Sequence, residues 1–217
     1  MGKYYKGILG AISGLVGTVV GASWRDIDYL RSKPKKSTKP ATEGQIEHRA
    51  EFTLMRSFMD GDVSVLFSAG FQSSAKNMTP FNAAFSENLK HAVTGVYPAL
   101  SIDYDQFVFA KGNLLACPDI AMATTEDAQL DFSWVNNADT GNPLNTDSTD
   151  KVTFAVYNPA KQRWAIRQSA ALRSALSYDL VVPVAWSGDM VHVWAGFVRA
   201  DLKKVSDSVY VGTTAVQ

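Results

Sequence analysis

The stretch from Gly7 to Trp24 constrains the fold most, because it carries no charge and holds glycine at positions 7, 10, 14, 17 and 21. A helix over this stretch would place the glycines on one face, where they would allow close helix packing in lipid. In an exposed helix, however, each glycine lowers helix stability by about 1 kcal/mol relative to alanine. As strands, Leu15–Val20 is β-branched and Ile27–Leu30 alternates, with turn-forming residues at Gly21–Asp26 between them. We favour the β-hairpin and keep the membrane-inserted helix as the alternative.

A secretory signal is not expected at this end of the chain. The glycines make the stretch only weakly apolar, and the polar run SWRDID closes it without an A-x-A-like cleavage site. We therefore expect no export through the Sec pathway.

The segment Ser32–Thr42 (SKPKKSTKPAT) holds four lysines and two prolines. Proline forbids a helix or a central strand here, and the lysines repel one another, so the segment should be extended and solvated. It is either a simple linker or an arm that lies on a neighbouring subunit or on nucleic acid. No aromatic residue interleaves the lysines, so stacking on single-stranded bases is not indicated.

Three helices are predicted next. Thr42 and Gln45 have the spacing of a capping box, and apolar residues then recur every four positions from Ile46 to Phe58. Two more helices are predicted over 63–71 and 79–93, the latter starting at Thr79-Pro80.

From Leu100 onward the pattern is that of short strands. The predicted strands are Leu100–Ala110, Leu114–Thr124, Ala128–Val135, Lys151–Tyr157, Arg163–Gln168, Tyr178–Val184, Met190–Arg199 and Ser208–Thr213. Short strands at this spacing, separated by turn residues, are typical of a β-sandwich. We expect residues 112–217 to fold alone, with Trp134 in the core.

Charge is distributed unevenly along a chain whose net charge is zero. Residues 1–56 hold ten Lys/Arg against five Asp/Glu, whereas residues 57–217 hold eleven against sixteen. A basic N-terminal part on a mildly acidic body suggests contact with something acidic, either nucleic acid or the acidic face of a neighbouring copy.

Catalytic and metal-binding motifs are not recognisable in the sequence. It has no G-x-S-x-G, H-E-x-x-H, P-loop or C-x-x-C pattern, and a single cysteine, Cys117, rules out an internal disulfide. Asp139, Asp147 and Asp150 lie in one polar loop, but their spacing fits no EF-hand, and His192 is expected to pack on a strand. A hydrolase that pairs two carboxylates only in the folded state stays open.

The N-terminal part resembles a module of uncharacterised phage and prophage structural proteins, which reads roughly G-x-V-G-x-V-V, an aromatic followed by Arg, a Pro-rich basic stretch, and T-x-x-Q-x-x-x-R-x-x-F. The matching residues are Gly14, Val16, Gly17, Val19, Val20, Tyr29, Arg31, Pro34, Pro40, Thr42, Gln45, Arg49 and Phe52. Leu15 stands where that module usually has Lys. The whole chain, including FNAAFSENLKHAVTG and the ending SVYVGT, is similar to a Bacteroidota family of unknown function.

Residues 113–215 resemble a fibronectin type III or related immunoglobulin-like domain. The run LLACPDIAMATTEDAQLDFSWV is similar to the first two strands of that fold, with Trp134 as its core tryptophan. The tyrosine that usually starts the corner of the penultimate strand is replaced around Gly188–Val191. Such domains bind or space other proteins far more often than they catalyse reactions.

Together these observations predict an α+β protein: a Gly-rich hairpin and basic arm over 1–41, a helical region over 42–98, and an immunoglobulin- or fibronectin III-like antiparallel sandwich over 99–217. We expect a non-enzymatic structural protein of a bacteriophage virion or prophage-derived particle, in its capsid or tail, without a cofactor or metal. It would be present in the cytoplasm before assembly. The alternatives are a bacterial surface or carbohydrate-binding protein and the hydrolase.

The partners expected are further copies of the chain or other virion proteins, with a host surface glycan as a further candidate; nucleic acid and membrane are less favoured. The predicted assembly interface consists of Gly14, Val16, Gly17, Val19, Val20, Gly21, Trp24, Tyr29, Arg31, Lys33, Lys35, Lys36 and Lys39.

Overall fold

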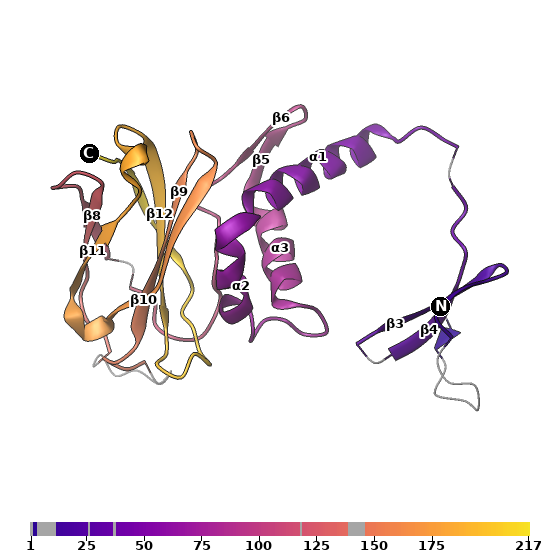
Figure 1. Ribbon diagram of the computed structural model, residues 1–217, viewed down its shortest axis with the longest axis horizontal. Helices are drawn as coiled ribbons and strands as arrows, with labels where there is room; N and C mark the ends of the chain where they lie inside the picture. Colours follow the sequence, from indigo (N-terminus) through magenta and orange to yellow (C-terminus); the bar gives the residue numbers. More distant parts are fainter. Residues whose placement is uncertain (1, 4–11, 26, 37, 118, 139–145) are drawn as a thin grey trace. The chain divides into compact units, whose positions relative to one another are not determined.

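The computed structural model describes residues 2–3, 12–25, 27–36, 38–117, 119–138 and 146–217 (Figure 1). Its contacts divide the chain into two compact units, Met1–Thr42 and Glu43–Gln217. We call them the N-terminal unit and the body.

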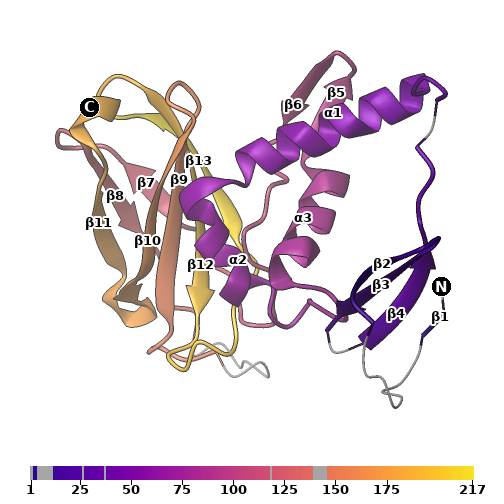
Figure 2. The same cartoon turned by 45° about the vertical axis from the view of Figure 1, so that its right-hand side comes forward.

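The N-terminal unit is an antiparallel sheet with the strand order β1-β4-β3-β2 (Figure 2). The strands are β1 (Gly2–Lys3), β2 (Gly14–Val16), β3 (Val19–Trp24) and β4 (Ile27–Ser32). The turn between β2 and β3 has two residues, since Val16 pairs with Val19, and Gly17 adopts a φ of 60° there. Two-residue hairpins need positive φ values, which glycine adopts without steric cost.

Residues 14–24 are therefore strands, and the helical alternative is wrong for them; Gly7 and Gly10 lie outside the described residues. The turn predicted at Gly21–Asp26 is shorter than expected, because β3 continues through Gly21 to Trp24 and the chain turns at Arg25 (φ 48°), before Ile27 pairs with Trp24. A Cβ atom on Gly21 would lie 2.0 Å from the backbone oxygen of Ile12. Gly21 thus serves a close backbone approach inside the sheet rather than a turn.

The body begins with three helices, at the positions that the sequence predicts. They are α1 (Glu43–Phe58), α2 (Ser64–Gly70), which follows the 3-10 turn η1 (Gly61–Val63), and α3 (Pro80–His91). α1 starts directly after Thr42. The Thr79 hydroxyl oxygen accepts a hydrogen bond from the Asn82 amide at 3.2 Å and caps α3.

Two antiparallel sheets and a hairpin complete the body. The hairpin pairs β5 (Val93–Val96) with β6 (Ala99–Ile102). The three-stranded sheet has the order β11-β8-β7, with β7 (Ala121–Ala123), β8 (Gln129–Ser133) and β11 (Ser177–Val181). The four-stranded sheet has the order β10-β9-β12-β13, with β9 (Lys151–Asn158), β10 (Arg163–Leu172), β12 (Met190–Val198) and β13 (Val209–Ala215). Short 3-10 turns lie at η2 (Arg173–Ala175) and η3 (Val184–Trp186).

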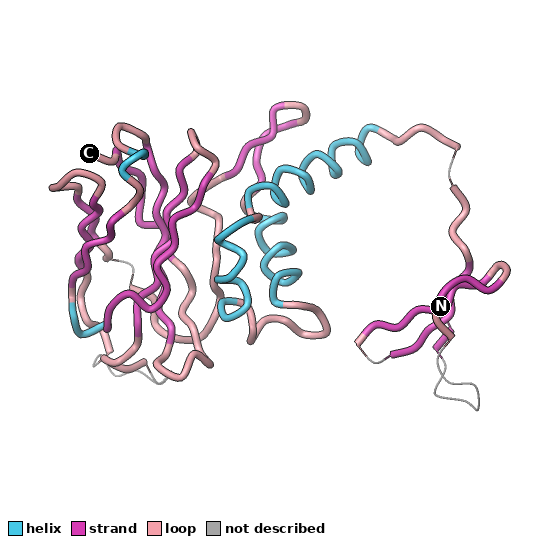
Figure 3. Tube along the Cα trace, in the orientation of Figure 1, coloured by secondary structure: helices cyan, strands magenta, loops and turns pink. Residues whose placement is uncertain are grey.

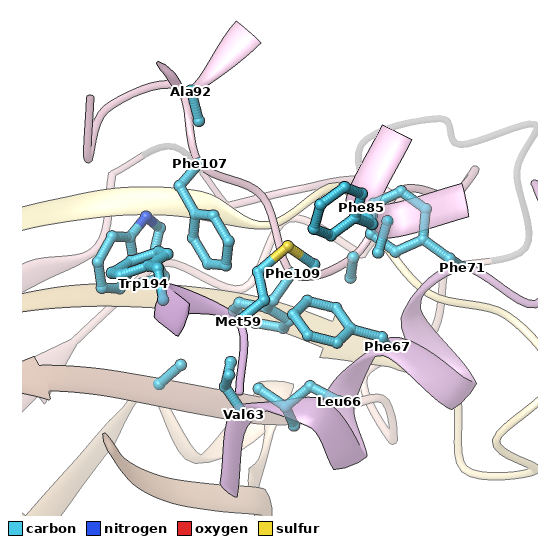
Figure 4. Packing of buried hydrophobic residues seen from close by; sticks show 14 of the residues in the cluster. Met59, Val63, Leu66, Phe67, Phe71, Phe85, Ala92, Phe107, Phe109 and Trp194 are labelled. Atoms are coloured by element: carbon cyan, nitrogen blue, oxygen red, sulfur yellow. The ribbon is translucent and has the colours of Figure 1, made fainter. Parts of the chain in front are cut away.

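The two sheets face each other across one core, and the helices cover the other side of the four-stranded sheet (Figures 1 and 3). Along β12, Val193 and Phe197 lie in the core between the sheets, whereas Trp194 and Val198 belong to the core under the helices. Figure 4 shows this second core, in which Met59 and Phe67 lie among Phe107, Phe109 and Trp194.

This packing joins the predicted helical region and the predicted sandwich in one compact unit, Glu43–Gln217, instead of separating them near residue 98. The physical reason is that β9 and β12 are apolar on both faces, so both faces must be covered. The body is therefore a β-sandwich with a helical layer, and the chain has the α+β class predicted from its sequence.

Two of the predicted strands are much shorter than expected. Leu100–Ala110 contains only the end of β6, and Leu114–Thr124 contains only β7. The buried Asn88 of α3 replaces the missing strand pairing: its side-chain oxygen accepts from the Val108 amide, and its side-chain nitrogen donates to the Val108 oxygen, both at 2.8 Å. Phe107 and Phe109 are thereby buried within a loop.

Three buried tryptophans fix loops and helix ends through their indole N–H groups. Trp134 donates to the Arg173 oxygen at 2.8 Å, Trp164 to the Phe58 oxygen at 3.0 Å, and Trp194 to the Tyr104 oxygen at 3.0 Å. Trp134 is 4% exposed, which confirms its predicted place in the sandwich core. Each indole thus combines a large apolar surface with one directed bond.

Candidate functional site

One face of the N-terminal sheet carries both aromatic side chains of strands β2 to β4 and several aliphatic ones, whereas Val16, Val19 and Leu30 lie on the opposite face. Residues that pair across neighbouring antiparallel strands lie on the same face, and side chains alternate between the faces along a strand. By the observed register, one face carries Leu15, Val20, Ala22, Trp24, Ile27, Tyr29 and Arg31. We call these seven residues the apolar face.

The apolar face is open to solvent within its unit. Leu15 is 55% exposed, Trp24 49% and Ile27 41%. Among the described residues from 12 to 42, Gly21 alone is buried. A sheet of this size has too little apolar surface in its own interior to be stable, so a second layer from another molecule would stabilise it.

The structure brings together only part of the predicted interface. Val20, Trp24, Tyr29 and Arg31 lie on the apolar face. Gly14, Val16, Val19 and Gly21 lie on the opposite face, and Gly17 occupies the β2–β3 turn, where a Cβ atom would meet nothing within 4 Å. A partner backbone against Gly17 is therefore not required to explain that glycine.

Leu15, Ala22 and Ile27 belong to the same face but were not predicted as interface residues. The signal that could have identified them is the two-residue period of β2, β3 and β4, once the β2–β3 turn is placed at Gly17–Thr18. The prediction of Leu15–Val20 as one continuous strand missed the turn at Gly17 and hid this register.

The lysine-rich segment leaves the sheet directly after β4. The Lys33 amide still donates to the Thr18 oxygen at 2.8 Å, whereas Lys35, Lys36 and Lys39 follow outside the sheet, and all four lysines are exposed. Residues 1–42 hold eight Lys/Arg against two Asp/Glu, a net charge of +6, and residues 43–217 hold thirteen against nineteen, a net charge of −6. The apolar face is thus attached to a strongly basic segment.

Two aspartates of the predicted polar loop, Asp147 and Asp150, form hydrogen bonds or an ion pair within the body. Asp150 and Arg173 are both fully buried and 3.7 Å apart, and the Asp150 carboxylate accepts from the Asp147 amide at 3.0 Å. Burial raises the pKa of Asp150. Asp139 lies outside the described residues. Within the described part of the chain, no group of three or more His, Cys, Asp and Glu residues could hold a metal ion.

His192 packs on its strand, as predicted. Its ring lies 3.8 Å from the Tyr104 ring in a stacked arrangement, and its Nδ1 is 2.7 Å from the Tyr210 hydroxyl. Burial lowers the pKa of His192, with the Asp105 carboxylate acting in the opposite direction.

Acid should destabilise the body through His192. The unfolded chain takes up a proton near pH 6.5, whereas the folded state holds the imidazole neutral to lower pH, so stability falls as the pH drops below about 6.5. Replacing His192 by Gln should make the loss of unfolding free energy between pH 7 and 5 shallower, as measured by urea titrations at several pH values. The matched surface substitution His91→Gln serves as the control, and equal pH dependence of wild type and His192→Gln would contradict this assignment.

A hollow of about 740 Å³ lies between the edge strands β10 and β11. Trp164 lines it but is 7% exposed and has its indole N–H bound to Phe58. Its ring therefore belongs to the core and offers no open stacking surface for a sugar.

None of the helices within the described residues is both long and apolar enough to cross a membrane.

Fold and surface together define a protein with a helix-covered β-sandwich body and a small N-terminal sheet whose apolar face is exposed within its own unit. Residues 11–212 match a family of unknown function, DUF6266, and the chain belongs to this family. Among curated proteins, none matches the chain.

A solved structure to which the chain is similar is the fn3 domain of the human collagen alpha-1(XX) chain, with 16% sequence identity and a TM-score of 0.34. The likeness covers 48% of this chain and 86% of that one.

Proposed function

We propose that this protein is a non-enzymatic structural protein that assembles through its N-terminal sheet. The observation that carries the proposal is the apolar face, on which Leu15, Trp24 and Ile27 are each more than two-fifths exposed. Aromatic and aliphatic side chains on a flat sheet are the usual centre of a protein interface, and the basic segment 33–39 would form its rim.

The particle in which it assembles is a bacteriophage virion or a prophage-derived particle. This part of the proposal is supported by the resemblance of residues 14–58 to a module of phage structural proteins. The sandwich, taken as immunoglobulin- or fibronectin III-like, would project and bind other virion proteins or a host surface glycan. The protein would be cytoplasmic before assembly.

The burial and pairing of three side chains in the body favour assembly over the two alternatives, sugar binding and hydrolysis. Trp164 beside the hollow is buried, which disfavours sugar binding there, and the pair Asp150–Arg173 is a buried ion pair rather than two carboxylates. An exposed apolar sheet face needs a partner, whereas neither alternative accounts for it.

The proposal predicts that self-association depends on the apolar face. Full-length protein should form oligomers, and Trp24→Glu should weaken them at least tenfold, because a charge replaces an exposed aromatic anchor of the interface. Residues 43–217 alone should be folded and monomeric. Size-exclusion chromatography with light scattering measures the masses, and circular dichroism checks the fold.

Val16→Glu is the matched control, since Val16 is 61% exposed and pairs with Val19 on the opposite face of the same sheet. It should leave the oligomers unchanged. Identical masses for wild type, Trp24→Glu and residues 43–217, with other proteins of the particle present as well, would overturn the assembly role.

A further inference from the structure

We propose that the apolar face and its basic segment dock on the three-stranded sheet of a second copy of this chain, in a head-to-tail contact. This inference rests on the proposed assembly function and names the partner surface.

Charge disfavours the simplest dimer, in which two N-terminal units would stack face to face. Each unit carries a net charge of +6, so such a dimer would oppose two strongly basic segments. The body carries −6, and the two charges cancel within the chain. Complementary charge steers association and suppresses like-charged pairings, so the body of another copy is the favoured partner.

The negative charge of the body is concentrated on one part of the sequence. Residues 112–150 hold seven Asp/Glu and no Lys/Arg, and this stretch supplies β7 and β8 of the three-stranded sheet. Of these acids, Asp131 lies in β8 itself, and Asp150 is buried beside Arg173. That sheet lies on the side of the sandwich away from the helices (Figure 1). Its inner face, with Leu130, Phe132 and Leu180, is buried in the sandwich core, so only its outer face is free to bind.

The outer face places two carboxylates directly opposite each other. Asp131 of β8 pairs with Asp179 of β11, and no residue of the three strands is Lys or Arg. Directly opposed like charges destabilise a sheet. Hydrogen bonds from Thr125 and Gln129 lower the pKa of Asp131, which keeps it charged. A cationic partner would relieve this unfavourable pair.

The rest of the outer face suits a flat sheet as its partner. Around the two carboxylates lie small side chains, Ala121, Ala123, Ser133 and Ser177, together with Val181, which is 62% exposed. Small side chains leave room for large ones such as Trp24 and Tyr29, and two sheets pack face to face with interdigitated side chains. The lysines that follow β4 could then reach Asp131 and Asp179.

Such a contact joins two different surfaces and is therefore heterologous. After one contact forms, the first copy still has a free three-stranded sheet and the second copy still has a free N-terminal unit. Further copies can therefore add head to tail, and the assembly becomes a closed ring or an open chain. A dimer in which two N-terminal units stack face to face would instead leave the three-stranded sheet unused.

Charge reversal on either side tests the pairing. An arm variant, Lys33→Glu with Lys35→Glu and Lys36→Glu, and a face variant, Asp131→Lys with Asp179→Lys, should each associate at least tenfold more weakly than wild type. An equimolar mixture of the two should associate again, because each acidic arm meets a basic face and each basic arm meets an acidic face. Light scattering after size exclusion measures both effects, and added salt should weaken the wild-type oligomers.

Glu43→Lys with Asp60→Lys is the matched control, since it changes the charge of the body equally at two exposed residues, the first of α1 and one just after its end. It should leave association unchanged. If the face variant fails to fold by circular dichroism, Asp179→Lys alone tests the same surface without removing the hydrogen bonds of Asp131.

The outcomes separate this inference from the proposed function. Loss of oligomers in Trp24→Glu but not in the face variants would refute the three-stranded sheet as partner and leave the assembly role standing. Restored association of the mixture supports the head-to-tail contact. Monomeric wild-type protein that binds nucleic acid or another protein through its lysines would overturn it.

Discussion

Replacing Trp134 by alanine should lower the unfolding free energy of the body by about 3–5 kcal/mol, the usual cost of a large-to-small change at a buried aromatic. Trp134 is 4% exposed and contacts Phe154 and Phe197, with ring centroids 6.2 and 6.3 Å away. Most domains are stable by only about 5–15 kcal/mol, so this substitution removes a large share of the total.

The effect should be large because Trp134 also supports a buried polar cluster. Its indole N–H satisfies the Arg173 oxygen, while the Arg173 guanidinium lies 3.7 Å from the Phe197 ring centre and donates to the Leu115 oxygen at 2.9 Å. Removing the indole leaves a buried oxygen unpaired beside an ion pair.

Urea denaturation of wild type, Trp134→Ala and Trp134→Phe measures both contributions. Trp134→Phe keeps most of the apolar volume and loses the hydrogen bond, so it should cost less than the alanine variant. Stability close to wild type in Trp134→Ala would show that this tryptophan does not support the core.

Elements governed by local patterns were predictable from the sequence. The Thr42–Gln45 spacing and Thr79-Pro80 located the starts of α1 and α3, and alternation located β8 to β13 within a few residues. The loop with Phe107 and Phe109 was not predictable as a loop, because its apolar alternation looks like a strand. What replaces the strand pairing is Asn88, which is remote in sequence from that loop.

The candidate site was predictable in its residue types and only partly in its arrangement. A charge-free, glycine-rich stretch next to four lysines indicated a surface for a partner. Which side chains share a face depends on where the turns lie. The β-branched run Leu15–Val20 looked like one strand and hid the turn at Gly17, whereas the turn-forming residues Gly21–Asp26 contain the turn that follows Trp24. Glycine is common in turns, so Gly21 looked like a turn residue. In the structure it is glycine because the Ile12 backbone lies too close for a side chain.

The domain boundary illustrates a further limit of local patterns. A strand with apolar residues on both faces has the same sequence pattern whether its second face is covered by a helix or by another sheet. Tyr157, Trp164 and Trp194 therefore gave no sign that helices cover them, although all three belong to the core beneath α1 and α2.

Residues 112–217 alone should consequently be molten rather than natively folded, although the strand pattern by itself suggested an independent sandwich. Without the helical region, Tyr157, Trp164 and Trp194 lose their covering layer, and Phe58 no longer accepts from Trp164. Three aromatic side chains that each bury about 150–250 Å² contribute roughly 11–19 kcal/mol at about 25 cal/mol per Å². This upper estimate equals or exceeds the stability of a typical domain, about 5–15 kcal/mol.

Two fragments decide the point, residues 43–217 and residues 112–217. The longer fragment should show a cooperative thermal transition and the tryptophan emission of buried indoles. The shorter one should keep β-type circular dichroism but bind a hydrophobic dye, emit at longer wavelength and lose cooperativity, as expected of a collapsed chain without fixed packing. A sharp transition in the shorter fragment would mean that the sandwich core between the two sheets is sufficient, and that α1 and α2 only cover a surface that tolerates water.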